Sequence, residues 1–122
     1  MWKVLLVEDE SLIRKGIRMT VNWGALNCMV VGEAENGEEG LKAVSDLHPD
    51  LIITDLRMPK MDGLEMLKKL REEGNEAAVI VLTAYDQFSY AQSALRLGVV
   101  DYLLKPFHDG ELEETILRIR KK

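Results

Sequence analysis

The sequence has few of the residues that mark secreted, zinc-binding or membrane proteins. It contains one cysteine, Cys28, and two histidines, His48 and His108. A single cysteine forms no disulfide within the chain, which fits a reducing cytoplasm, and we interpret Cys28 as a small buried side chain. We expect both histidines at the surface, with no His or Cys cluster for zinc. No apolar run approaches the roughly 20 residues that a membrane-spanning helix needs.

The sequence also lacks an excess of basic residues. Its 122 residues include 16 Lys and Arg against 21 Asp and Glu, a formal net charge of −5. Domains that bind nucleic acids usually carry a basic face, so we interpret the basic tail at 118–122 as a solvated helix end. The apolar run at the N-terminus leads into acids rather than the small residues of a signal-peptide cleavage site. We therefore expect a cytoplasmic protein that contacts no membrane.

Five apolar runs alternate with five helical patterns along the chain. The runs span residues 3–7, 28–34, 50–54, 78–83 and 101–105. Three of them are short, continuous and rich in Val, Ile and Leu, as strands covered on both faces are. The segments between them begin and end at helix-start and helix-stop residues such as Asn36, Asp62 and Gly74. Five strand–helix units predict an α/β fold, a single doubly wound domain over residues 1–122 with a parallel sheet.

Residues with chemical roles follow four of these strands. Glu8 and Asp9 follow the first strand, Asp55 the third, Thr83 ends the fourth, and Lys105 ends the fifth. Open parallel sheets bind ligands at the carboxyl ends of their strands, so we expect these side chains at one edge. Two carboxylates ~6 Å apart repel by ~3 kcal/mol at an effective dielectric of ~20. The lysine and a divalent cation can offset that repulsion, and oxygen ligands favour Mg²⁺ or Mn²⁺ over zinc.

Each of these residues also has an ordinary structural explanation. Glu8 can be a solvated acid at a helix start, where the helix dipole favours it. Thr83 can be a strand-favoured residue, Lys105 an exposed lysine and Asp55 the cap of a turn. These explanations do not predict that the residues occur together at the ends of four strands.

Four motifs resemble the receiver domains of bacterial response regulators, the phosphoryl acceptors of two-component signalling. In order, they are VEDE at 7–10, DLRMPKMDG at 55–63, LTAY at 82–85 and DYLLKPF at 101–107. The resemblance covers the whole chain. It implies a flavodoxin-like (βα)5 receiver fold with strand order 2-1-3-4-5, and a sensor histidine kinase as partner.

The resemblance implies a role for each acidic residue. Asp55 would accept the phosphoryl group. Mg²⁺ (or Mn²⁺) would be held by Asp9, Asp55 and the main-chain carbonyl of Arg57, with Glu8 acting through water. The domain would catalyse its own phosphorylation and dephosphorylation rather than act as a conventional enzyme.

The resemblance also implies a switch. Thr83 would donate its hydroxyl to one phosphoryl oxygen, and Lys105 would pair with another, aimed by a cis peptide before Pro106. Thr83 would move toward the phosphoryl group and Tyr102 would rotate into the space left behind. The surface of the fourth helix, fifth strand and fifth helix would then change its partner preference and could form a homodimer. The alternative is a tyrosine that only covers the sheet edge.

A finer resemblance is to receivers that precede an AraC-type DNA-binding domain. Trp23, Tyr85 and the segment FSYAQ at 88–92 carry it. It implies a receiver cut from a longer transcription regulator, in which a missing C-terminal domain binds DNA. Gly40 departs from the family, which usually has alanine there, and glycine should cost that helix up to ~1 kcal/mol.

Three other functions stay open at this point. The first is a stand-alone receiver that acts by protein contact. The second is a Mg²⁺-dependent phosphatase of the haloacid-dehalogenase type, although that class carries Asp-x-Asp at its first strand and this chain has Glu8-Asp9-Glu10 there. The third is an FMN carrier, which needs a hydroxyl- and glycine-rich loop after the first strand.

Overall fold

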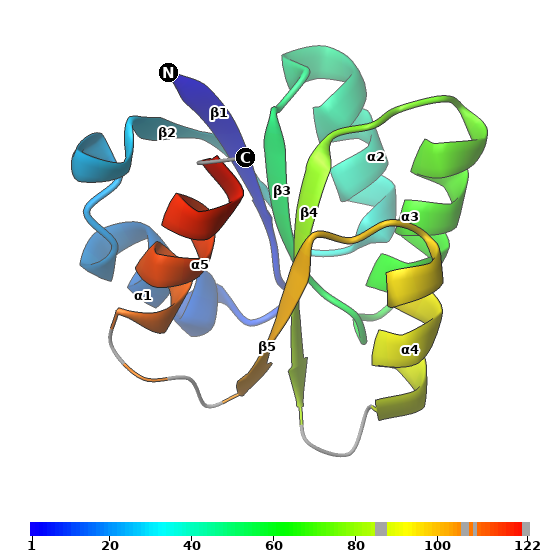
Figure 1. The fold of residues 1–122 in the computed structure, drawn as a ribbon. Coiled ribbons are helices and arrows are strands. Elements are labelled where there is room, and N and C mark those ends of the chain that lie inside the picture. The colour runs from blue at the N-terminus through cyan, green and yellow to red at the C-terminus, as the bar shows by residue number, and fades with distance from the viewer. Residues whose placement is uncertain (85–87, 106–107, 109, 121–122) are drawn as a thin grey trace.

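The computed structural model describes residues 1–84, 88–105, 108 and 110–120, and over these ranges it shows strands alternating with helices (Figure 1). The strands are β1 (Trp2–Val7), β2 (Cys28–Ala34), β3 (Leu51–Asp55), β4 (Ala78–Ala84) and β5 (Asp101–Lys105). The helices are α1 (Ser11–Thr20), α2 (Gly37–Leu47), α3 (Gly63–Glu72), α4 (Phe88–Arg96) and α5 (Glu111–Arg120), with a short 3₁₀ turn η1 (Gly24–Leu26). The predicted strands agree with the observed ones to within one residue at each end.

The sheet is parallel, and its strand order is β2-β1-β3-β4-β5, as the resemblance implies. Helices α1 and α5 cover one face, and α2, α3 and α4 cover the other (Figure 1). The chain reverses its direction of strand addition between β1 and β3, which lie side by side. Ligands of such sheets bind at that reversal, beyond the carboxyl ends of the strands.

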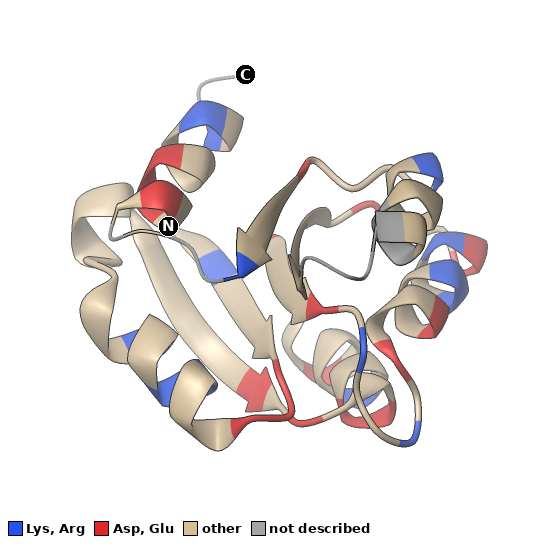
Figure 2. Ribbon diagram, turned by 90° about the horizontal axis from the view of Figure 1, so that it is seen from below, with Lys and Arg blue, Asp and Glu red and all other residues tan. Residues whose placement is uncertain are grey.

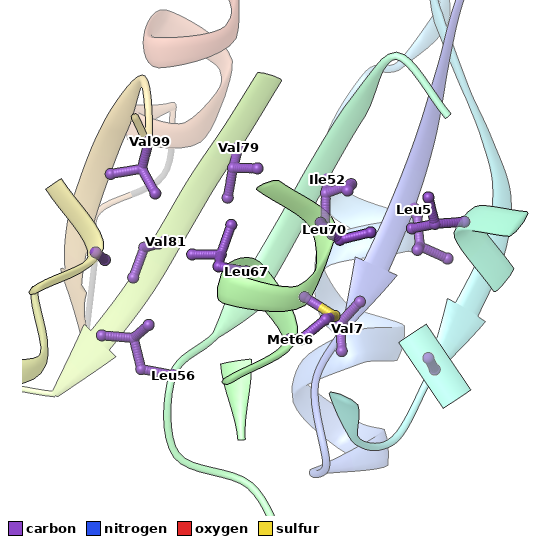
Figure 3. Packing of buried hydrophobic residues seen from close by; sticks show 13 residues of the cluster. Leu5, Val7, Ile52, Leu56, Met66, Leu67, Leu70, Val79, Val81 and Val99 are labelled. Carbon is purple, nitrogen blue, oxygen red and sulfur yellow. The ribbon is translucent and has the colours of Figure 1, made fainter. Parts of the chain in front are cut away.

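Alternate residues of the three central strands, β1, β3 and β4, enter two different cores. Leu5 and Val7 of β1 belong to the core under α2, α3 and α4, where Figure 3 shows them close to Met66 and Leu70 of α3. Val4 and Leu6 belong to the core under α1 and α5. Burying a Leu or Val side chain contributes ~1.5–3 kcal/mol, so this double burial stabilises the register of these three strands.

Two side-chain caps begin the helices on either side of β3. The Asn36 side-chain oxygen accepts a hydrogen bond from the Glu39 amide at 2.9 Å, and Asp62 accepts one from the Glu65 amide at 2.9 Å. Both caps confirm the helix starts predicted from the sequence. Because Asp62 caps α3, Asp55 is not needed for that purpose.

Gly40 allows α2 to approach its neighbours closely. A Cβ atom there would lie 2.5 Å from the Met66 sulfur and 3.4 Å from a Val7 methyl group. The glycine therefore has a packing reason in addition to its cost in helix propensity, because Met66 occupies the space that a methyl group would need.

The remaining surface expectations are mostly confirmed. Cys28 is buried, and burial raises the pKa of its thiol. His48 and His108 are both exposed. In the basic tail, Arg118 is exposed as expected, whereas Arg120 is partly covered and its guanidinium lies 4.7 Å from the centroid of the Trp2 ring.

Candidate functional site

Strand alternation brings charged side chains together at the carboxyl edge of the sheet. Glu8, Asp55 and Lys105 each follow by two residues a side chain of the α1–α5 core, so period-two alternation points all three to the same side. Figure 2 looks onto this edge and shows acidic segments around the strand ends, with the basic end of β5 beside them.

Asp55 is held on both of its carboxylate oxygens. Oδ1 accepts hydrogen bonds from the Leu56 amide at 2.7 Å and the Arg57 amide at 3.4 Å. Oδ2 accepts one from the Lys105 ammonium at 2.8 Å. The residue is 7% exposed. The main chain and the lysine therefore orient a nearly buried carboxylate at the end of β3.

Glu8 is bound to the same lysine. Its Oε1 lies 2.6 Å from Lys105 Nζ, and its Oε2 accepts a hydrogen bond from the Glu10 amide at 3.2 Å. Burial disfavours the charged form of Lys105, but the hydrogen bonds that its ammonium donates to Asp55 and Glu8 outweigh this effect and raise the pKa of Lys105. Lys105 is therefore charged at neutral pH and bridges the two buried carboxylates.

The site has more negative charge than Lys105 can balance. Burial raises the pKa of Glu8 from 4.5 to about 7; Lys105 opposes this rise, while Asp9 and Asp55 add to it. The ammonium of Lys105 is one positive group beside three carboxyl groups, those of Glu8, Asp9 and Asp55. A further positive charge at the site would favour the ionised form of Glu8.

The same three carboxylates fit a divalent cation. Glu8, Asp9 and Asp55 each offer an oxygen, and these oxygens lie within 4.8 Å of one another. All are hard oxygen donors, which suit Mg²⁺ or Mn²⁺. A cavity of about 380 Å³ next to Asp9 is lined by the loop after β3 and leaves room for water ligands. The carbonyl of Arg57 as a further ligand stays a prediction.

Thr83 and Tyr102 lie on the neighbouring strands. Thr83 is 1% exposed, and its hydroxyl donates to the Ala84 carbonyl at 3.2 Å. Tyr102 pairs in register with Val81 and is 38% exposed. Alternation places Thr83 and Tyr102 on the side of the sheet that α2, α3 and α4 cover. Their part in a switch stays a prediction. The cis peptide expected before Pro106 lies outside the described residues, and so does Tyr85, which carries part of the finer resemblance.

Two supporting residues escape prediction from the sequence. Arg14 donates to the Glu8 carbonyl at 2.5 Å and also pairs with Glu33 at 2.9 Å, which fixes the chain after β1. Gly63 lies so close to Asp55 that a Cβ would be 2.1 Å from the Asp55 carbonyl oxygen. The position of Gly63 directly after the Asp62 cap could have indicated its role from the sequence. The sequence offers no comparable signal for Arg14.

Comparison with known proteins decides the family. The family model for the response regulator receiver domain matches residues 4–117. The chain belongs to that family. The match confirms the resemblance stated above and favours a receiver over the phosphatase and the flavin carrier.

Known receivers share the fold in detail. The REC domain of AraT, a response regulator from Geobacillus stearothermophilus, superimposes with a TM-score of 0.92 and 47% sequence identity, covering 98% of this chain and 93% of that one. A LuxR-family DNA-binding response regulator from Staphylococcus aureus gives a TM-score of 0.88 at 26% identity, covering 98% of both chains. The receiver fold and its strand order are thereby confirmed.

Sequence relatives of this receiver are longer proteins. The uncharacterized transcriptional regulatory protein YesN of Bacillus subtilis is 36% identical over all of this chain and 34% of its own length. The transcriptional regulatory protein HptR of Staphylococcus aureus is 34% identical over 98% of this chain and 46% of its own. The chain thus spans less than half of either relative.

In the described part of the receiver, no helix has both the length and the apolar character to cross a bilayer.

Proposed function

We propose that this receiver is a phosphorylation-dependent signalling switch, in which Asp55 accepts a phosphoryl group from a sensor histidine kinase. The observation that carries the proposal is the setting of Asp55. Its nearly buried carboxylate is oriented by two main-chain amides and Lys105, and it shares a cation-binding set of oxygens with Glu8 and Asp9.

The chemistry requires positioning and charge rather than proton transfer. A carboxylate oxygen of Asp55 attacks the phosphorus in line, and the bond from phosphorus to the donor's nitrogen breaks as the acyl phosphate forms. Mg²⁺, when bound, supplies positive charge to the phosphoryl oxygens. Lys105 pairs with one of these oxygens, and the hydroxyl of Thr83 donates to another.

The output of the switch rests on the surface formed by α4, β5 and α5. The phosphoryl group adds nearly two negative charges beside Thr83 and Lys105, and their response changes the packing of Tyr102. The longer relatives named as transcriptional regulators support an output domain after this receiver, and the AraC-type resemblance favours a DNA-binding one. A receiver that signals by protein contact alone is the alternative, and a gene that continues past Lys122 would argue against it.

The direct test is phosphorylation by a small donor. The chain is incubated with acetyl phosphate and Mg²⁺, and intact mass is measured for one added phosphoryl group. We expect the adduct in the wild type, and we expect it to vanish in Asp55→Asn and in the presence of a chelator. If hydrolysis outruns detection, binding of beryllofluoride with Mg²⁺ replaces the adduct as the readout. A folded wild type that shows neither response contradicts the proposal.

A further inference from the structure

The loop between β3 and α3, residues 56–62, forms one wall of the proposed metal site. Arg57, Met58 and Pro59 line the cavity beside Asp9. Within the loop, Lys60 adopts a φ of 66°, a left-handed backbone conformation that is unfavourable for residues other than glycine. A loop that includes such a residue keeps its shape only where its surroundings hold it. The contacts that hold it therefore matter to the site.

One contact holds the loop from inside. The Gly63 amide donates to the Leu56 carbonyl at 2.7 Å, and any Cβ on Gly63 would collide with the Asp55 carbonyl oxygen. This contact joins the first residue of the loop to the start of α3 and closes the loop on itself.

A second contact joins the loop to α2, a helix that carries none of the proposed site residues. The Gly37 amide donates to the Met61 carbonyl at 2.7 Å. A Cβ on Gly37 would lie 2.8 Å from that oxygen, 2.9 Å from the Asp62 carbonyl oxygen and 2.7 Å from the Met61 Cγ. Gly37 does not have a positive φ, so its lack of a side chain serves this close approach and not an unusual conformation.

The helix is fixed on both sides of this contact. Asn36, directly before Gly37, is 4% exposed and caps α2, and Gly40 seats the next turn against Met66. Two of the atoms in the way are main-chain oxygens, which cannot rotate aside as a side chain can. A methyl group at position 37 must therefore displace the loop, which carries Arg57.

We propose that Gly37 is a positioning residue for the metal site, because it docks α2 against the loop that forms the wall of that site. The inference rests on the proposed function, since it assigns Gly37 a role in the Mg²⁺ binding proposed above. Partners that orient metal ligands from outside the ligand set typically change metal affinity by about 10–100-fold when altered.

The test compares Gly37→Ala with Gly16→Ala. Both add one methyl group at a helical glycine, but nothing lies within 4 Å of a Cβ at Gly16 in α1. Isothermal titration calorimetry measures the Mg²⁺ affinity, and amide NMR spectra locate the perturbation. We expect Gly37→Ala to bind Mg²⁺ about tenfold more weakly, with shifts concentrated in residues 56–62. We expect Gly16→Ala to match the wild type.

Met61→Ala approaches the same contact from the loop, and it decides the case if Gly37→Ala does not fold. It removes a partly buried side chain, and we expect a loss of affinity of several-fold. A folded Gly37→Ala with wild-type affinity overturns the proposal, as does wild-type affinity in Met61→Ala when Gly37→Ala is unfolded. If the wild type itself binds no Mg²⁺, the proposed function fails, and the role of Gly37 fails with it.

Discussion

At the scale of single residues, Lys105 has two opposing effects on the site. Its ammonium lies 2.8 Å from Asp55 Oδ2 and 2.6 Å from Glu8 Oε1, so it stabilises two buried carboxylates. The same positive charge repels a cation bound to those oxygens. In the proposed reaction, Lys105 therefore weakens metal binding but strengthens the contact with the phosphoryl group.

Lys105→Met separates these two effects. Removing the ammonium should tighten Mg²⁺ binding by about tenfold, because a unit charge near a divalent ion is worth over 1 kcal/mol even in a high dielectric. Phosphorylation by acetyl phosphate should slow by about 10²-fold, as is typical when one preorganised donor is lost. Calorimetry and intact-mass kinetics measure the two effects. Weaker Mg²⁺ binding in a folded variant would contradict the account of the charge balance.

At the scale of elements, the helical glycines Gly16 and Gly40 differ in the space available for a side chain. Gly16 lies in α1 with nothing within 4 Å of a Cβ, whereas a Cβ on Gly40 in α2 would overlap the Met66 sulfur. Met66 is fully buried, so its side chain has little room to move. Helix propensity favours alanine at both positions, and only packing distinguishes them.

Gly16→Ala and Gly40→Ala should therefore change stability in opposite directions. We expect Gly16→Ala to raise the free energy of unfolding by up to ~1 kcal/mol through helix propensity. We expect Gly40→Ala to lower it by about 1 kcal/mol, because overpacking costs ~1–3 kcal/mol and propensity returns only part of that. Urea unfolding measures both. In the Met66→Ala background, Gly40→Ala should lower the free energy of unfolding by less than it does in the wild type. Equal costs in the two backgrounds would contradict the proposed clash.

At the scale of the whole molecule, exposed apolar side chains occur on all three elements of the proposed output surface. Leu95 of α4, Tyr102 and Leu104 of β5, and Leu117 of α5 are 49%, 38%, 46% and 44% exposed. Apolar side chains from adjoining elements favour a protein contact when they gather on one surface. This distribution agrees with the proposed phosphorylation-dependent partner surface, and we propose a second copy of the chain as one such partner.

Beryllofluoride with Mg²⁺ should therefore promote self-association of the wild type, which sedimentation velocity detects. Leu95→Glu should weaken that association at least about tenfold, since it places a charge where an apolar contact forms. Leu12→Glu is the matched control, because Leu12 is 82% exposed but lies on α1. Equal effects of the two substitutions would show that the surface of α4, β5 and α5 is not the one used.

The sequence by itself determined the order of elements and the location of the site. Apolar runs of strand length alternate with helical periods, and this pattern depends only on local spacing. Asp55 and Lys105 could be placed together because parallel strands end at the same edge, whatever the details of packing. The caps at Asn36 and Asp62 could also be predicted, because a cap acts within three residues of its own position.

Only the tertiary structure decided how close these parts come to one another. The pKa of Glu8 depends on burial and on groups up to 97 residues away in the chain. Gly40 looked like a departure with only a cost until Met66 was seen to fill its space. The close approach of Gly37 to the Met61 carbonyl likewise joins residues 24 positions apart in the chain. Local pattern specifies which face a residue occupies, but contact distances and desolvation arise only when distant segments pack together.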